Sequence, residues 1–185
     1  MTLDEIRAQI EEIDAQMKLL FLKRMECARH VAETKAQTGG DVFVLEREIS
    51  IIERRAAGVT EAHDEYEMFL HGLMNLSRRY QYGLLKGMQD KVIADVLAAA
   101  GLDEKKEHSQ VTVRFVCDGA DSDLNLFVDM AKLNKVPIET MSLKTEDGVQ
   151  NVVMTLSGSL KAEGMRRLLC QMGKEAGNFA IMALS

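Results

Sequence analysis

The chain has 185 residues, of which 46% are hydrophobic and 28% are charged, and this composition is typical of a globular protein of one domain or two small ones. The net charge of −6 argues against nucleic acid and anionic membranes as partners, but it leaves room for a local cationic pocket. The 3 cysteines lie far apart and the 4 histidines are scattered, so neither a disulfide framework nor a metal site is predicted. No apolar run is long enough to cross a membrane, and we expect a cytoplasmic protein.

The first predicted element is one long helix over residues 3–37, which starts from a capping box at Thr2 and Glu5. Its apolar residues recur at alternating spacings of three and four, which is the pattern of a heptad seam. These seam residues are Leu3, Ile6, Ile10, Ile13, Met17 and Leu20. At about 1.5 Å per residue the helix is a rod of roughly 50 Å, whereas a domain of about 100 residues has a radius of gyration of only ~13 Å. We therefore predict an intertwined homodimer, in which a second copy covers the rod.

Three cations lie on or beside this apolar stripe. Arg24 falls on the seam itself, Lys35 lies on or next to it, and Arg7 borders its other end. A buried cation needs a partner, because unpaired burial costs several kcal/mol. For a lone cation, a structural ion pair or a side chain that extends to water is the simpler interpretation. Several cations that converge on one pocket would instead indicate an anionic ligand.

Two further helices are predicted in the N-terminal part of the chain. A shorter second helix follows the glycines at 39–40. Its buried side is predicted to be Leu45, Ile49 and Ile52. Charged residues lie on or next to that side, namely Arg47, Glu48 and Arg55. A third helix starts near Thr60, and its apolar pattern runs on to Gly101. Ser77 and Gln81 are four residues apart and therefore share one face of this helix.

The hydrophobic pattern changes after residue 102. The charged segment 103–108 has no period, and we interpret it as a linker. From Gln110 the apolar residues alternate, which predicts a half-buried strand. The predicted organisation is therefore an all-α, three-helix domain at residues 1–102 and a second domain at residues 109–185.

The second domain is predicted to have the element order βαββαβ. Its first strand is followed by a helix that ends before Pro137 and by a hairpin that turns at residues 146–148. A second helix, capped by Ser159 and bearing Leu160, leads into a last strand at residues 178–184. This order is that of the ferredoxin-like arrangement, a small α+β fold.

The candidates for chemistry are seven polar residues on the three N-terminal helices. They are Arg7, Arg24, Lys35, Arg47, Glu48, Ser77 and Gln81. The set contains no arrangement of a nucleophile with a base and no carboxylate pair for acid–base catalysis. It suits a catalyst that holds a dianion in a reactive shape and stabilises charge as it moves.

These seven residues, in this order, resemble the pattern of the all-α (type II) chorismate mutases. The pattern has two arginines and a lysine along the first helix, an Arg-Glu pair opening the second helix, and a serine and a glutamine four residues apart on the third. The resemblance covers about residues 3–88. It implies an enzyme, an isomerase of Phe and Tyr biosynthesis that rearranges chorismate to prephenate without metal, cofactor or covalent intermediate.

The resemblance also implies a role for each residue. The residues assigned to catalysis are Arg24, Lys35, Glu48 and Gln81. Arg24 would grip one carboxylate of chorismate, Lys35 and Gln81 would hydrogen-bond the ether oxygen of the breaking bond, and Glu48 would accept from the ring hydroxyl. The residues assigned to substrate binding are Arg7, Arg47 and Ser77. Arg7 would come from the other subunit and grip the second carboxylate, and the other two would support carboxylate binding or the pocket wall.

One position departs from the family pattern. The family often has an Asp three residues before the Arg of the Arg-Glu pair, and this chain has Val44 there. Asp41 is a candidate replacement. Val44 favours one of three alternatives that stay open, a non-catalytic sensor of amino acids built on a degenerate mutase domain. The other two are elimination of pyruvate from isochorismate on the same scaffold and a helical assembly module.

The C-terminal domain resembles ACT-type regulatory domains in its element order. This resemblance implies an aromatic amino acid as effector, with Gly119 as the turn glycine after the first strand. The segment 120–123 contains two aspartates and does not match the usual apolar ligand-binding loop, so a domain that serves only assembly is the alternative.

Overall fold

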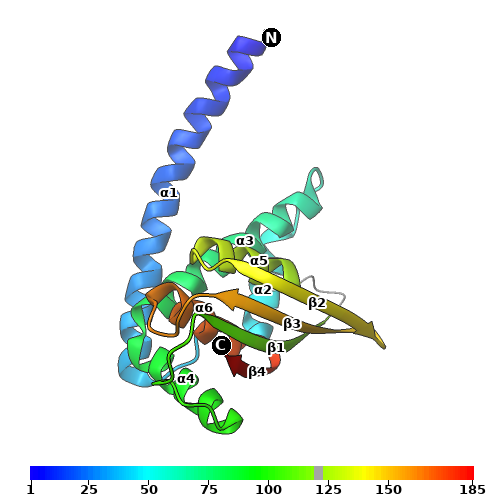
Figure 1. Ribbon diagram of the computed structural model, residues 1–185. Coiled ribbons are helices and arrows are strands. Elements are labelled where there is room, and N and C mark those ends of the chain that lie inside the picture. Colours follow the sequence, from blue (N-terminus) through cyan, green and yellow to red (C-terminus); the bar gives the residue numbers. More distant parts are fainter. Residues whose placement is uncertain (119–122) are drawn as a thin grey trace.

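The computed structural model of this chain describes residues 1–118 and 123–185 (Figure 1). The predicted turn at Gly119 and residues 120–122 of the acidic segment that follows it lie outside the described residues. Four helices come first, followed by a sheet with two more helices, in the order α1 to α4, β1, α5, β2, β3, α6 and β4.

The first helix, α1 (Leu3–Thr38), agrees closely with its prediction. The capping box is formed: the Thr2 hydroxyl accepts from the Glu5 amide, and the Glu5 carboxylate accepts from the Thr2 amide at 2.6 Å. At the other end Gly39 adopts a left-handed conformation with φ = 75°, which glycine reaches without the steric cost that a Cβ would bring.

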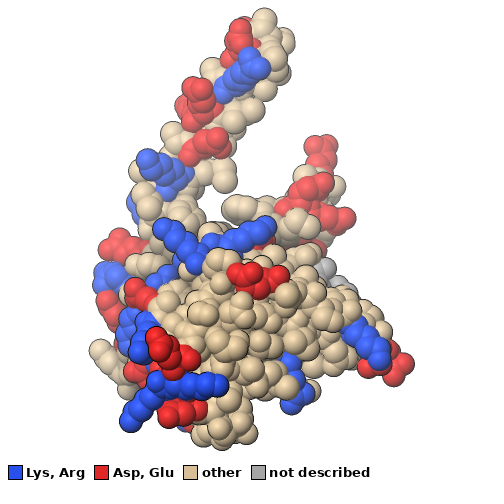
Figure 2. Space-filling view, in the orientation of Figure 1, with Lys and Arg blue, Asp and Glu red and all other residues tan. Residues whose placement is uncertain are grey.

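The N-terminal half of α1 extends away from the rest of the chain (Figure 1). The described buried residues of α1 are Ala28 and Ala32, both in its C-terminal half, where α1 packs against α3. The predicted seam residues of the other half are exposed, for example Ile13 at 55% and Leu20 at 65%. Figure 2 shows charged and uncharged side chains interspersed along this protruding rod. No helix in the described ranges is both long and apolar enough to span a membrane.

The second helix, α2 (Leu45–Ala56), buries less than the sequence predicts. Ile52 is buried, but Leu45 and Ile49 are 51% and 45% exposed. The prediction of three buried residues is therefore wrong for the single chain, because α3 contacts only part of the apolar side of α2 in this chain.

The third predicted helix is in fact two, α3 (His63–Leu84) and α4 (Lys86–Ala100), and the prediction of one helix up to Gly101 is wrong. At Leu85 the backbone turns to φ = −92° and ψ = 67°. The buried side chain of Gln89 donates from Nε2 to the carbonyl of Tyr82 at 2.6 Å, and thereby satisfies a carbonyl at the break. This break directs α4 onto the C-terminal domain, where it packs against α6 and β4.

In the described part of the chain, four antiparallel strands form one sheet in the order β2-β3-β1-β4. Their bounds are β1 Gln110–Asp118, β2 Ile138–Glu146, β3 Val149–Ser157 and β4 Gly177–Leu184. The hairpin between β2 and β3 turns at Asp147 and Gly148, both with positive φ, as a type I′ turn requires. The prediction of a ferredoxin-like α+β fold is confirmed.

The helices α5 (Asp123–Leu133) and α6 (Glu163–Glu175) follow the predicted order. They share a hydrophobic core with the inward side chains of the strands and with Ile93 and Leu97 of α4. The predicted cap at Ser159 is wrong, because α6 begins only at Glu163. The Ser159 hydroxyl accepts from the Lys161 amide at 3.2 Å in a turn before the helix, and Leu160 is buried in that turn.

Candidate active site

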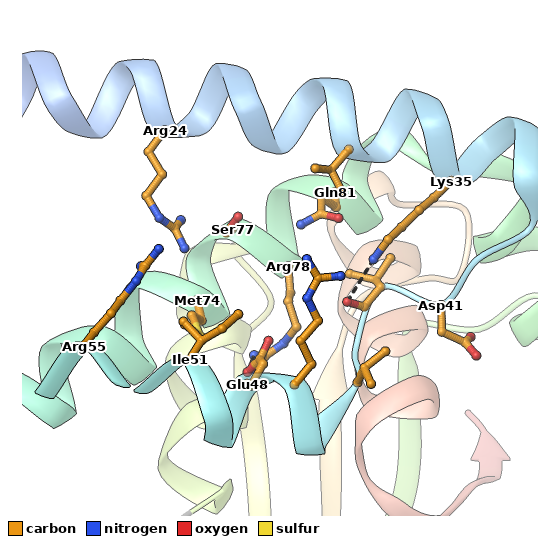
Figure 3. Close-up of a pocket in the computed structure, with 14 residues that line it drawn as sticks. Arg24, Lys35, Asp41, Glu48, Ile51, Arg55, Met74, Ser77, Arg78 and Gln81 are labelled. Carbon is orange, nitrogen blue, oxygen red and sulfur yellow. Dashed lines mark hydrogen bonds and ion pairs between the residues drawn. The ribbon is translucent and has the colours of Figure 1, made fainter. Parts of the chain in front are cut away.

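Three helices of the N-terminal domain enclose a pocket of about 270 Å³ (Figure 3). Six of the seven predicted site residues line it: Arg24, Lys35, Arg47, Glu48, Ser77 and Gln81. Because α1, α2 and α3 each contribute to this set, the pocket depends on the packing of the whole helical domain.

The seventh predicted residue, Arg7, lies elsewhere in this chain. It is on the protruding part of α1, where its guanidinium pairs with Asp4 at 3.2 Å and its side chain is 65% exposed. Arg7 and Lys35 are twenty-eight positions apart on one unbroken helix, which at about 1.5 Å per residue is roughly 42 Å. Arg7 therefore cannot reach the pocket of its own chain.

Arg24 and Arg55 approach the pocket from opposite walls, on α1 and α2 (Figure 3). Arg24 donates from Nη1 to the carbonyl of Leu73 at 3.3 Å, which directs its side chain inward. Burial, and next the positive charge of Arg55, hold the pKa of Arg24 below its ordinary value. An anion between the two guanidinium groups would be stabilised by both.

Lys35 enters the pocket from the C-terminal part of α1. Its Nζ donates to the carbonyl of Val42 at 3.2 Å, which fixes the side chain across the end of the pocket. Burial, and next the positive charge of Arg47, hold the pKa of Lys35 below its ordinary value. The electrostatic cost of this cation would be reduced by a negative charge in the pocket.

Ser77 and Gln81 line the pocket from α3, and both are buried. Within the part of the chain that the structure describes, Oε1 of Gln81 accepts no hydrogen bond. Its amide group lies near Lys35 at the same end of the pocket (Figure 3). A buried amide oxygen that accepts no hydrogen bond is costly to fold, so it is more readily explained by a ligand contact than by stability.

The family model described as chorismate mutase type II matches residues 6–82, which contain α2, most of α1 and α3, and all the residues of the pocket. Residues 6–82 are a type II chorismate mutase domain. No curated protein and no solved structure gives a significant match to the chain.

Glu48 of the mutase domain pairs with an arginine that the sequence prediction missed. Arg78 is 5% exposed, and its Nη1 donates to Oε2 of Glu48. A pattern in the sequence could have indicated this position, since Arg78 follows Met74 by four residues and precedes Tyr82 by four, and both of these are buried. Arg55 was noted beside the buried side of α2 but was not assigned to the site, and it also lines the pocket.

The structure shows where Val44 and Asp41 lie, the two residues concerned in the one departure from the family pattern. Val44 lines the pocket of the mutase domain, so an apolar side chain occupies the position where an Asp is frequent. The carboxylate of Asp41 pairs with Lys174 of α6 at 2.6 Å, and this hydrogen bond is the main cause that lowers the pKa of Asp41. In Figure 3 its side chain points away from the centre of the pocket. Asp41 does not replace the missing Asp in this geometry.

The charges of the pocket favour a small anion with more than one negative group. Its cationic lining residues are Arg24, Lys35, Arg47, Arg55 and Arg78, against the carboxylates of Glu48 and Asp41. Among residues 1–118 and 123–185, no cluster of three or more His, Cys, Asp or Glu side chains is placed to hold a metal ion. The arrangement can bind carboxylates and donate hydrogen bonds to an oxygen on which negative charge develops.

Proposed function

We propose that this protein is a chorismate mutase, which rearranges chorismate to prephenate. One observation carries the proposal: inside a type II chorismate mutase domain, the residues assigned to catalysis converge from three helices on one pocket. The predominance of cations in that pocket suits a dianionic substrate. The reaction is unimolecular, so a site that holds the substrate in its reactive shape supplies much of the catalysis.

Each pocket residue has a role in this proposal. Arg24 binds one carboxylate, and Arg55 faces the same space from α2. Lys35 and Gln81, at the other end, donate to the ether oxygen as its bond to carbon breaks and negative charge develops there. Glu48 accepts from the ring hydroxyl. Arg78 donates to Oε2 of Glu48, and this contact leaves the other carboxylate oxygen available to the substrate.

The proposal is tested by incubating the purified full-length protein with chorismate and measuring prephenate. We expect prephenate to form well above the uncatalysed rate, and Arg24→Ala to remove most of that activity. Incubation with isochorismate, followed by measurement of pyruvate, tests the lyase alternative in parallel. A wild-type protein that binds chorismate but forms neither product would instead support a non-catalytic sensor.

Substitution of Gln81 should change the pH dependence of the reaction. The amide of Gln81 can donate a hydrogen bond at any ordinary pH, whereas a glutamate at this position donates only when it is protonated. We therefore expect Gln81→Glu to be active only toward acidic pH, with activity that falls as the carboxyl group loses its proton. The pH profile of kcat, measured for the wild type and the variant, checks this. A profile identical to that of the wild type would remove Gln81 from the site.

A further inference from the structure

The C-terminal end of α6 reaches from the second domain to the mutase pocket. Two consecutive residues make the contact. Lys174 pairs with Asp41 at 2.6 Å, and the carboxylate of Glu175 accepts from Nε of Arg78 at 2.8 Å. Asp41 and Arg78 both line the pocket. The C-terminal domain is therefore in direct contact with the outer wall of the site.

Glu175 is almost completely buried. Its side chain is 6% exposed, and its second oxygen accepts from Nε2 of Gln171 at 3.3 Å. Burial, and next the negative charge of Glu175, raise the pKa of the Tyr82 phenol. A buried carboxylate is costly unless it is paired, and here Arg78 is the pairing cation.

Arg78 connects this carboxylate to the pocket. The guanidinium group is planar and offers its N–H donors in fixed directions. One edge donates from Nε to Glu175, Nη1 donates to Glu48, and Nη2 approaches Asn75 at 3.5 Å. Burial opposes the charge of Arg78, but Glu175 and next Glu48 outweigh it and raise the pKa of Arg78. Arg78 thus stays a cation held between two carboxylates.

We propose that Glu175 is a positioning residue of the mutase site, which acts through Arg78 on Glu48. The proposal rests on the proposed function and extends it to the second domain. With Glu175 in place, Arg78 is neutralised on its Nε edge and gives Glu48 one hydrogen bond. Without that charge, Glu48 becomes the only carboxylate within reach of Arg78 in the described structure. A bidentate salt bridge between Arg78 and Glu48 would then draw both oxygens of Glu48 away from the substrate.

The test is Glu175→Gln, which removes the charge but keeps the size and an oxygen acceptor for Arg78. Glu163→Gln is the matched control. Glu163 opens the same helix and pairs with Lys86, the first residue of α4, at 2.5 Å, but it is exposed and does not line the pocket. We expect kcat/KM for prephenate formation to fall by about 10-fold in Glu175→Gln, the scale of coupling between neighbouring charges. Glu163→Gln should stay within about twofold of the wild type.

A second pair of variants separates positioning from a structural role. In a Glu48→Gln background, Glu175→Gln should cause little further loss, because the residue through which it acts is already changed. If the same 10-fold loss appears in that background, or if Glu175→Gln is fully active, the proposal is wrong. Should Glu175→Gln not fold, Glu175→Asp keeps the charge and withdraws it from Arg78. Glu175→Asp should lower kcat/KM by less than 10-fold, and this loss should disappear when it is measured in the Glu48→Gln background.

A spectroscopic measurement keeps this test independent of turnover. The carboxyl ¹³C resonance of Glu48, assigned by its loss in Glu48→Gln, should move in Glu175→Gln and stay in place in Glu163→Gln. If the wild type forms no prephenate but this resonance moves, the proposed function fails while the link from Glu175 to Glu48 stands. An unmoved resonance would overturn the link itself.

Discussion

Lys35→Ala should lower kcat for prephenate formation by about 10²-fold or more, which is the scale for the loss of one preorganised donor to a developing charge. The Nζ of Lys35 is held across the end of the pocket by Val42, next to the amide of Gln81. In the proposed mechanism, a charged donor in this place would stabilise negative charge on the ether oxygen in the transition state more than in the substrate. We therefore expect kcat to change far more than KM. Steady-state kinetics of the purified variant check this.

The same substitution should have little effect on stability. Because burial and then Arg47 lower the pKa of Lys35, the folded state holds this proton less tightly than the unfolded chain, and the charge opposes folding at any pH below that pKa. Removal of the charge therefore stabilises the folded state, whereas loss of the hydrogen bond to Val42 destabilises it by about 1 kcal/mol, and the two effects oppose each other. Thermal unfolding of Lys35→Ala should resemble that of Lys91→Ala, an exposed control that should keep full activity. A variant that unfolds readily but keeps its specific activity would make Lys35 structural.

The pH profile gives an independent check on Lys35. In the proposed mechanism a protonated Lys35 is the donor, so kcat/KM of the wild type should fall as the pH rises through the pKa of Lys35 in the free enzyme, which burial and then Arg47 hold below its ordinary value. This fall on the alkaline side should be absent from the residual activity of Lys35→Ala.

Arg7→Ala and Lys35→Ala should each be nearly inactive alone, and together they should restore activity. The two residues are roughly 42 Å apart on one helix, so one substrate can contact both only when they come from different subunits. In a mixed dimer, one site combines the intact Lys35 of the first chain with the intact Arg7 of the second, and the other site lacks both. Random pairing of equal amounts makes about half of the dimers mixed, so about a quarter of all sites should be wild type.

The experiment unfolds and refolds the two variants together, with different tags to show that mixed dimers form. The matched control is Lys35→Ala refolded with Gln81→Ala. Both of these residues line the pocket of one chain, so each site of that mixed dimer carries one defect and no activity should return. If tagged mixed dimers of Arg7→Ala and Lys35→Ala form and activity stays at the level of the single variants, the shared site is wrong.

The exposed seam of α1 supports the same proposal of a dimer. In the single chain its apolar residues from Leu3 to Leu20 face water, although their spacing is that of a packed helix pair. An apolar groove formed by α1 and α3, lined among others by Met17, Phe21 and Leu73, continues this surface toward Arg24. A second copy of α1 would cover both features at once.

Local chemistry in the sequence determined much of this fold. The capping box at Thr2 and the glycine at 39 set the ends of α1, and the Asp147-Gly148 pair set the hairpin, because each acts within a few residues of its own position. The change of hydrophobic period after residue 102 separated helices from strands. Six residues that line the pocket could be named from the sequence, because the family pattern fixes their order along three helices.

Long-range packing decided the rest. The break at Leu85 has no proline, and it follows from the side chain of Gln89, which bonds the carbonyl of Tyr82, and from the docking of α4 on the second domain. The pairing of Arg78 with Glu175 joins residues ninety-seven positions apart, and no periodicity within α3 or α6 could indicate it. A local pattern shows that a side chain will be buried. Which charge it meets there depends on how two domains pack, and in this protein that packing places a carboxylate of the C-terminal domain against the arginine that holds Glu48.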